Sequence, residues 1–310
     1  MDADTQDLLR SSIREMFATE EGDIVDGLRS LGWDDVVAED PDVAVELLFT
    51  EQGAAGKASS ALDTVAYVTD KGGTTHPVLH PLGSVSGAKV QAGCLEVDAV
   101  LLAKPSAAAV VRADDGRAYL IDENVVTAHA SAVGGFDPAS RLYRVKLDLD
   151  PAATAVVDVD CSHVVAVARR ALAAELVGNG NAMLQLATAQ ISDRHQFGRP
   201  IGANQSPRHR LAESYALLGG AAELVRAAGH SGSDLDARTA KAYAGFAVDT
   251  TSRSCLQVCG AIGLTTEHVL PGYVKRARIL DALYGGWSAT AEEIGAELLA
   301  AAAVPVGHRL

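Results

Sequence analysis

The sequence is poor in basic residues and in aromatic residues. Its 26 lysines and arginines face 40 aspartates and glutamates, which gives a formal net charge of −14. An acidic chain repels phosphate backbones, so nucleic acid is not expected as a partner. Any polyanionic ligand would need lysine or arginine placed locally against the overall charge. The aromatic content of 5% and the abundance of alanine favour helices that pack through small side chains.

Long apolar runs and cysteine are also scarce. No run of about 18 apolar residues is present, so we expect no membrane span. The acidic start, Met1 to Asp4, has no signal-peptide hydrophobic region, and the cytoplasm is the expected location. Disulfides are not expected there. Of the four cysteines, Cys255 and Cys259 have helical i,i+4 spacing, but no second ligand pair accompanies them; we expect buried thiols and no metal site.

Three regions of different composition predict an α+β protein with three domains. Residues 1–75 place apolar residues at helical spacing and predict a helical domain. Residues 76–158 contain short β-prone runs, with Asp115-Gly116 between two of them as a hairpin signal. Residues 159–310 return to a helical pattern and predict a bundle. The strands expected in the middle region cover 97–102, 107–112, 118–121, 143–149 and 155–159.

The helical regions can be divided further. In the first domain we expect helices around 8–17, 28–33, 43–52 and 59–68, followed by a turn-rich linker over 71–77. In the bundle we expect helices over 163–194, from 207 to a loop at 229–233, and over 237–258, 273–283 and 290–302. Gly180 is a candidate close-packing point in the first of these helices. Asp249 and Arg253, at i,i+4 spacing, are expected to form a solvated ion pair.

The most informative stretch of the chain is 194–202, Arg-His-Gln-Phe-Gly-Arg-Pro-Ile-Gly, with Gln205 following it. Arg194 offers a permanent, forked positive charge that suits a pyrophosphate. Gln196 can hydrogen-bond through either end of its amide, and Phe197 offers a flat apolar surface to an aromatic ring. A helix that ends with a basic residue and a glycine would explain part of this string, but not all of it.

A second motif follows at 257–263, Gln-Val-Cys-Gly-Ala-Ile-Gly. Gly260 would allow the backbone to approach a phosphate or ribitol closely. Close helix packing of small residues explains this motif about equally well when it is taken alone. The methyl group of Ala261, next to Gly260, could narrow the space through which such a ligand reaches the backbone.

Together, and at this distance from each other, the two motifs resemble the flavin-contacting motifs of the acyl-CoA dehydrogenase family. The resemblance implies FAD as cofactor, with Arg194, Gln196, Phe197 and Gln205 contacting it from across a subunit interface. It likewise implies that Gln257 and Gly260 lie along the FAD of the neighbouring subunit, although Ala261 stands where a second glycine is usual. The order of helices, β domain and helix bundle matches the architecture of the family.

The same resemblance places a catalytic glutamate at one of two positions, and neither holds a carboxylate here. One position aligns with Tyr284, in Leu-Tyr-Gly-Gly, and the other with Ala168. A tyrosine, with a reference pKa of about 10, is a poor base at neutral pH. Glu175 and Asp281 are nearby in the sequence, but each is off the family positions. We therefore expect no catalytic residue in this chain.

The first two domains are shorter than the resemblance implies. The N-terminal helical domain is truncated, and the reduced β domain, residues 76–158, lacks the tryptophan that covers the flavin ring in the family. These features resemble the short subunits of heteromeric, α2β2 acyl-CoA dehydrogenases associated with steroid degradation. The resemblance implies an FAD-contacting subunit without a base, in an enzyme that introduces an α,β double bond into an acyl-CoA thioester.

Several partners follow from this interpretation. A second acyl-CoA dehydrogenase subunit would carry the glutamate, the substrate would be a steroid-derived acyl-CoA, and an electron-transfer flavoprotein or similar acceptor would receive the electrons. Two alternatives remain open. The chain could be a complete homomeric dehydrogenase with a relocated base, such as Glu175 or Asp281, or a helical interaction protein that has lost flavin.

Overall fold

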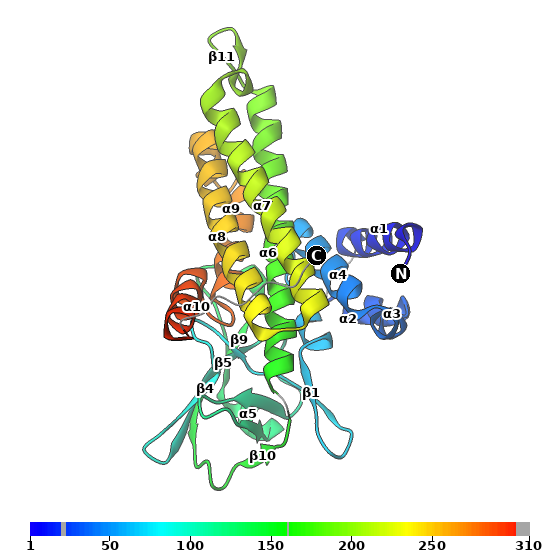
Figure 1. The fold of residues 1–310 in the computed structure, drawn as a ribbon, viewed down its shortest axis with the longest axis vertical. Helices are drawn as coiled ribbons and strands as arrows, with labels where there is room; N and C mark the ends of the chain where they lie inside the picture. The colour runs from blue at the N-terminus through cyan, green and yellow to red at the C-terminus, as the bar shows by residue number, and fades with distance from the viewer. Residues whose placement is uncertain (20–22, 160, 302–310) are drawn as a thin grey trace.

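The computed structural model describes residues 1–19, 23–159 and 161–301. A long helical bundle forms the axis of the molecule, the N-terminal helices pack against its side, and the β region lies at one end (Figure 1). The far end of the bundle carries a small β-hairpin labelled β11. The order of the three regions is the one that the sequence predicts.

Four helices open the chain: α1 (Ala3–Thr19), α2 (Val25–Ser30), α3 (Trp33–Glu39) and α4 (Pro41–Ala55). Local signals set the bounds of α4. The carboxylate of Asp40 accepts a hydrogen bond from the first turn, Pro41 follows at the first helical position, and Gly56 ends the helix at φ 64°. The expected helices around 8–17 and 43–52 are confirmed.

The expected helix over 59–68 is wrong. The chain forms a 3-10 turn, η1 (Ala61–Thr64), and then strand β1 (Tyr67–Thr69), which pairs with β2 (Thr75–Pro77). Valine, tyrosine and threonine are side chains that fit a strand better than a helix once a pairing partner is available. That partner lies within the segment expected to be only a linker.

Beyond the β1–β2 pair, the described part of the β region forms two antiparallel sheets that share one apolar core. The larger sheet joins β3 (His80–Pro81), β5 (Cys94–Leu101), β9 (Tyr143–Leu149) and β8 (Ala130–Ala132), with β4 (Ala88–Gln91) beside β5. The smaller joins β10 (Ala155–Val157), β7 (Ala118–Ile121) and β6 (Ala109–Arg112). The hairpin expected at Asp115-Gly116 is confirmed, because β6 and β7 pair antiparallel around it and Gly116 has φ 84°. The sequence did not predict helix α5 (Glu123–His129), although Asp122 caps it.

Five long helices build the bundle: α6 (Cys161–Asp193), α7 (Gln205–Ser231), α8 (Asp234–Cys259), α9 (Leu270–Ala282) and α10 (Trp287–Ala301). They agree with the expected helices to within a few residues. The loop expected at 229–233 is shorter, because α7 continues to Ser231 and stops at Gly232, whose φ is 62°. The hydroxyl of Ser233 then caps α8 by accepting from Asp236 N.

Glycines allow the helices to cross at close range. A Cβ on Gly178 would lie 2.0 Å from the carbonyl oxygen of Thr50, and one on Gly53 would lie 2.0 Å from that of Glu175. The backbones of α4 and α6 therefore touch at this crossing. Gly180 is confirmed as a close-packing point, since its Cβ would lie 2.5 Å from Leu218. These contacts seat the N-terminal helices in the main core.

The expected ion pair between Asp249 and Arg253 forms, although the Asp249 carboxylate itself is buried. Its side chain is only 8% exposed and binds Arg253 at 2.8 Å and Arg278, on α9, at 2.5 Å. The Asp249 carboxylate thus links α8 to α9, while Arg253 remains 74% exposed and Arg278 43% exposed. Sequence spacing predicted Arg253 as a partner of Asp249, whereas Arg278 lies on another helix and was not predicted.

Candidate functional site

The first motif forms the exposed hairpin at the tip of the bundle (Figure 1). Helix α6 ends at Asp193, and β11 (His195–Gln196) pairs antiparallel with β12 (Arg199–Pro200). Phe197 and Gly198 make the turn with φ 54° and 78°, the pattern of a tight hairpin of type I′. A phenylalanine in the left-handed region is strained, and here its side chain is 100% exposed. The turn therefore presents an aromatic ring that the chain itself leaves uncovered.

The polar side chains of this motif also face solvent. Arg194, Gln196 and Gln205 are all exposed. Within the described ranges the Arg194 guanidinium takes part in no hydrogen bond or ion pair, whereas Arg199 in the same hairpin binds Asn204 Oδ1 at 2.6 Å. The structure thus brings the four predicted residues together on one projecting end, and leaves the charge of Arg194 available.

The second motif lies toward the same end of the bundle, on α8 and the following 3-10 turn η4 (Gly260–Leu264) (Figure 1). Gln257 is exposed on the last turn of α8. Gly260 has φ 67° and ψ −148°, a conformation that is essentially restricted to glycine. Its Cβ would meet no described atom within 4 Å, so the backbone is open on that side. Backbone conformation alone is sufficient to require this glycine.

Tyr284, which the sequence resemblance aligns with the family's glutamate, is buried, with 2% of its surface exposed. Its hydroxyl hydrogen-bonds to His80 Nδ1 at 2.8 Å, and His80 Nε2 bonds to Asp63 Oδ1 at 2.8 Å. Burial, with the Asp63 carboxylate adding to it, raises the pKa of the Tyr284 phenol above its ordinary value. The phenol is therefore neutral and cannot serve as a base at physiological pH.

The backbone around Tyr284 is tied to the β region. Tyr284 N donates to Pro81 O at 3.1 Å, Gly83 N donates to Ala282 O at 2.8 Å, and Leu82 bridges Leu283. Two segments distant in the sequence thus meet beside Tyr284. The cavity that remains beside Tyr284 is about 20 Å³, enough for a single water molecule.

A buried lysine supports this junction from the other side. Lys241, which is 1% exposed, donates from Nζ to Asp281 O at 2.9 Å and to Gly285 O at 3.4 Å. Burial lowers its pKa to about 8. Ala168, the other position that the resemblance aligns with the family's glutamate, is completely buried. Lys241 therefore fixes the loop that carries Tyr284.

The two carboxylates considered as relocated bases have structural partners. Glu175 is 2% exposed, and its Oε1 accepts from Arg276 Nη2 at 2.6 Å and from Nε at 3.1 Å. Asp281 accepts from Trp287 N at 3.0 Å, and its Oδ1 lies 3.9 Å from Lys241 Nζ. Burial raises the pKa of Asp281 above its ordinary value. Neither carboxylate is among the residues that line the cavity beside Tyr284.

The cysteine pair is buried, as expected. Cys255 and Cys259 are both inaccessible to solvent, and burial raises the pKa of the Cys255 thiol to about 12. Protonated thiols in an apolar core behave as small hydrophobic side chains. Sequence reasoning missed His80, Asp63 and Lys241, because they are isolated polar residues that lie in no motif and meet only through the fold.

Comparison with known proteins agrees with this architecture. Residues 161–300 match the family model described as acyl-CoA dehydrogenase, C-terminal domain. Acyl-CoA dehydrogenase IpdE2 of Mycobacterium tuberculosis is 34% identical over 149 residues, which are 48% of this chain and 45% of that protein. The chain thus spans about half, or less, of the curated relatives it matches.

Two solved structures show the same fold over almost the whole chain. The Tcur3481-Tcur3483 steroid ACAD G363A variant aligns with a TM-score of 0.71 and 20% identity, covering 97% of this chain and 99% of that one. The ChsE4-ChsE5 complex from Mycobacterium tuberculosis gives a TM-score of 0.71 and 16% identity, covering 99% of each chain. At such identities the likeness concerns the fold. Residues 161–300 are similar to the acyl-CoA dehydrogenase C-terminal domain, and the whole chain has an acyl-CoA dehydrogenase-like fold, as predicted.

The helices also bear on the membrane question. Within the described ranges, no helix combines the length and apolar character needed to cross a bilayer.

Proposed function

We propose that this chain is the FAD-contacting subunit, without a catalytic base, of a heteromeric acyl-CoA dehydrogenase. The assembly would introduce an α,β double bond into an acyl-CoA thioester derived from a steroid. One contrast carries the proposal. The position that the resemblance gives to the base holds a buried tyrosine beside a cavity of about 20 Å³, while the motif that resembles a flavin contact stands exposed at the tip of the bundle.

The exposed tip is chemically suited to an FAD held by a neighbouring subunit. Arg194 has an uncompensated guanidinium for a pyrophosphate, and Phe197 offers a bare aromatic face. Gln196 and Gln205 carry exposed amides, and the backbone at Gly260 is open. FAD bound there would supply the acceptor for a hydride. These residues of this chain, together with Gln257 on α8, would bind and orient the FAD.

The reaction also needs a base to remove the α-proton, and the described carboxylates considered as relocated bases are held in other contacts. Glu175 is paired with Arg276, and Asp281 caps the backbone of Trp287. The base would therefore be a glutamate of the partner subunit. The likeness to a steroid ACAD and to a two-component complex supports a heteromeric assembly and a steroid-derived substrate. An electron-transfer flavoprotein or a similar acceptor would reoxidise the flavin.

Co-expression with a longer acyl-CoA dehydrogenase homologue from the same genome tests this proposal. Size-exclusion chromatography with multi-angle scattering should give a mixed assembly, and its absorbance spectrum should show flavin. The chain alone should bind little flavin. A yellow, active protein from the chain alone would favour a homomeric enzyme. A stable, colourless chain that ignores the partner would favour a flavin-free interaction protein.

A further inference from the structure

A second cleft lies on the face of α6 opposite to the cavity beside Tyr284. Its volume is about 320 Å³, within the lower range of small-molecule sites. On α6 it is lined by His163, Ala166, Val167 and Arg170, whereas Cys161, Val164 and Val165 line the small cavity. At about 100° per residue the two sets of side chains point in opposite directions. The cleft is thus separate from the small cavity beside Tyr284.

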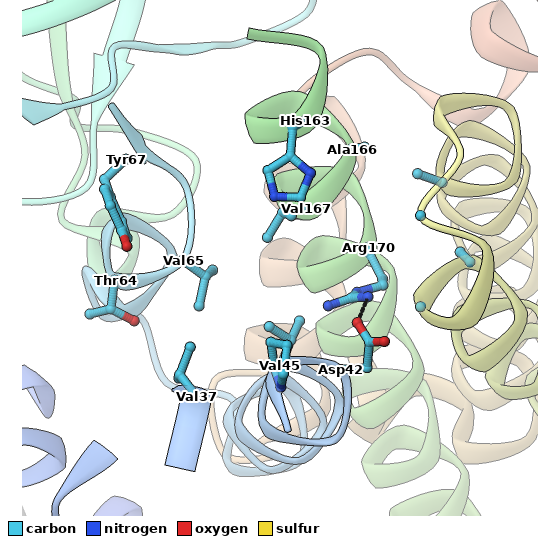
Figure 2. A pocket seen from close by; sticks show the side chains of 15 residues that line it. Val37, Asp42, Val45, Thr64, Val65, Tyr67, His163, Ala166, Val167 and Arg170 are labelled. Atoms are coloured by element: carbon cyan, nitrogen blue, oxygen red, sulfur yellow. Dashed lines mark hydrogen bonds and ion pairs between the residues drawn. The ribbon is translucent and has the colours of Figure 1, made fainter. Parts of the chain in front are cut away.

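The walls of the cleft come from four parts of the fold (Figure 2). Helices α3 and α4, the segment around η1 and β1, helix α6, and the junction of α7 with α8 all contribute. The lining is mainly aliphatic and contains few polar groups. Its apolar members include Val37, Val45, Val65, Ala166, Val167 and Ala228. An apolar body of modest size would therefore match most of the surface.

Arg170 is the distinctive polar group of the cleft. It is 7% exposed, and Figure 2 shows its guanidinium directed into the space between Val45 and Val167. Within the described ranges its single hydrogen bond runs from Nη1 to Asp42 Oδ1, and its buried Nε has no partner. A Cβ on Gly229 would lie 3.1 Å from Nη1, so the end of α7 packs directly over this pair. The arginine is held in place with most of its five donors unused.

The charges around Arg170 indicate which acceptor the cleft can take. Asp42 already neutralises the guanidinium, and its carboxylate would repel a second anion. His163, Thr64 and Tyr67 are the other polar side chains that line the cleft, and Figure 2 shows them around its rim. A neutral oxygen can accept from the unused N–H groups without meeting this repulsion. We propose that the cleft binds a compact, mainly apolar molecule through a carbonyl oxygen that accepts a hydrogen bond from Arg170.

Three bicyclic probes of similar size test the proposal on the full-length chain, without flavin or partner. They are 2-decalone, which has a carbonyl oxygen, decalin, which has none, and decahydro-2-naphthoate, which is an anion. Ligand-observed NMR titration should show saturable binding of 2-decalone, at least about tenfold tighter than the other two, since a hydrogen bond to a charged group is worth that factor or more. Binding of 2-decalone no tighter than that of decalin would overturn the role of Arg170.

Two variants locate the site. Val167→Phe fills the cleft from α6 and should abolish binding, whereas Val156→Phe, an equal change at an exposed position of β10, should leave it unchanged. Val37→Phe fills the cleft from α3 and serves the same purpose if circular dichroism shows that the first variant is misfolded. Binding that survives in every folded cleft-filling variant would overturn the proposal.

Asp42→Asn provides the third arm. It removes the compensating charge, so the preference should change from the ketone to the naphthoate. A preference for the ketone that persists in this variant would contradict the electrostatic argument. Because none of these measurements uses flavin or turnover, their outcome is independent of the proposed dehydrogenase function.

Discussion

Replacing Arg194 by alanine separates a cofactor contact from a structural role. The side chain is exposed and, within the described ranges, binds no other residue. Its removal should therefore change the free energy of unfolding by no more than about 0.5 kcal/mol. If it contacts the pyrophosphate of FAD, the loss of a charge-assisted hydrogen bond should cost about 1.5–3 kcal/mol of flavin binding. That corresponds to roughly a ten- to hundredfold weaker affinity.

The assay is flavin release from the co-expressed assembly on dilution, followed by the recovery of flavin fluorescence. Arg199→Ala is the matched control, because Arg199 lies in the same hairpin and is bound to Asn204. The Arg194 variant should release flavin at much higher protein concentration than the wild type, with an unchanged unfolding transition. Equal flavin retention in the wild type and the Arg194 variant would refute the cofactor role.

Three further outcomes are expected. Glu175→Gln and Asp281→Asn, each in the flavin-loaded assembly, should keep activity within tenfold, and a folded variant that loses about 10²–10⁴ in rate would show that the base lies in this chain. Gly178→Ala should destabilise the chain by more than about 1–3 kcal/mol in urea unfolding, because its Cβ would lie 2.0 Å from a backbone carbonyl of α4. Gly219→Ala is the control: its Cβ would meet no described atom within 4 Å, and it should stabilise the chain by about 0.5–1 kcal/mol. Equal effects of the two substitutions would contradict the packing argument. The pKa of Lys241 is about 8 in the folded chain and 10.5 in the unfolded chain, so between pH 8 and 10.5 only the unfolded lysine still binds its proton. The free energy of unfolding of the wild type, relative to that of Lys241→Met, should therefore rise over this pH range. A difference that stays constant with pH would rule out the buried charge.

Sequence patterns were sufficient wherever structure is decided locally. The bundle helices follow from apolar periodicity, and Gly232 and Ser233 mark the boundary between α7 and α8. The hairpin at Gly116 follows from the turn preference of one dipeptide. The helix prediction for 59–68 is wrong because these side chains suit either a helix or a strand, and pairing with β2 favours the strand.

The sequence by itself determined that Tyr284 and Ala168 stand at the two positions where the resemblance places a glutamate, and that residues 194–205 resemble a flavin-contacting motif. Only the tertiary structure decided that Tyr284 is hydrogen-bonded to His80 and that the cavity beside it is only about 20 Å³. Those contacts join residues 204 positions apart, so no local pattern encodes them. The same holds for Arg170, which a helical pattern marks only as a polar residue. Its unused donors become a candidate binding group only because four separate segments of the fold enclose a cavity around them.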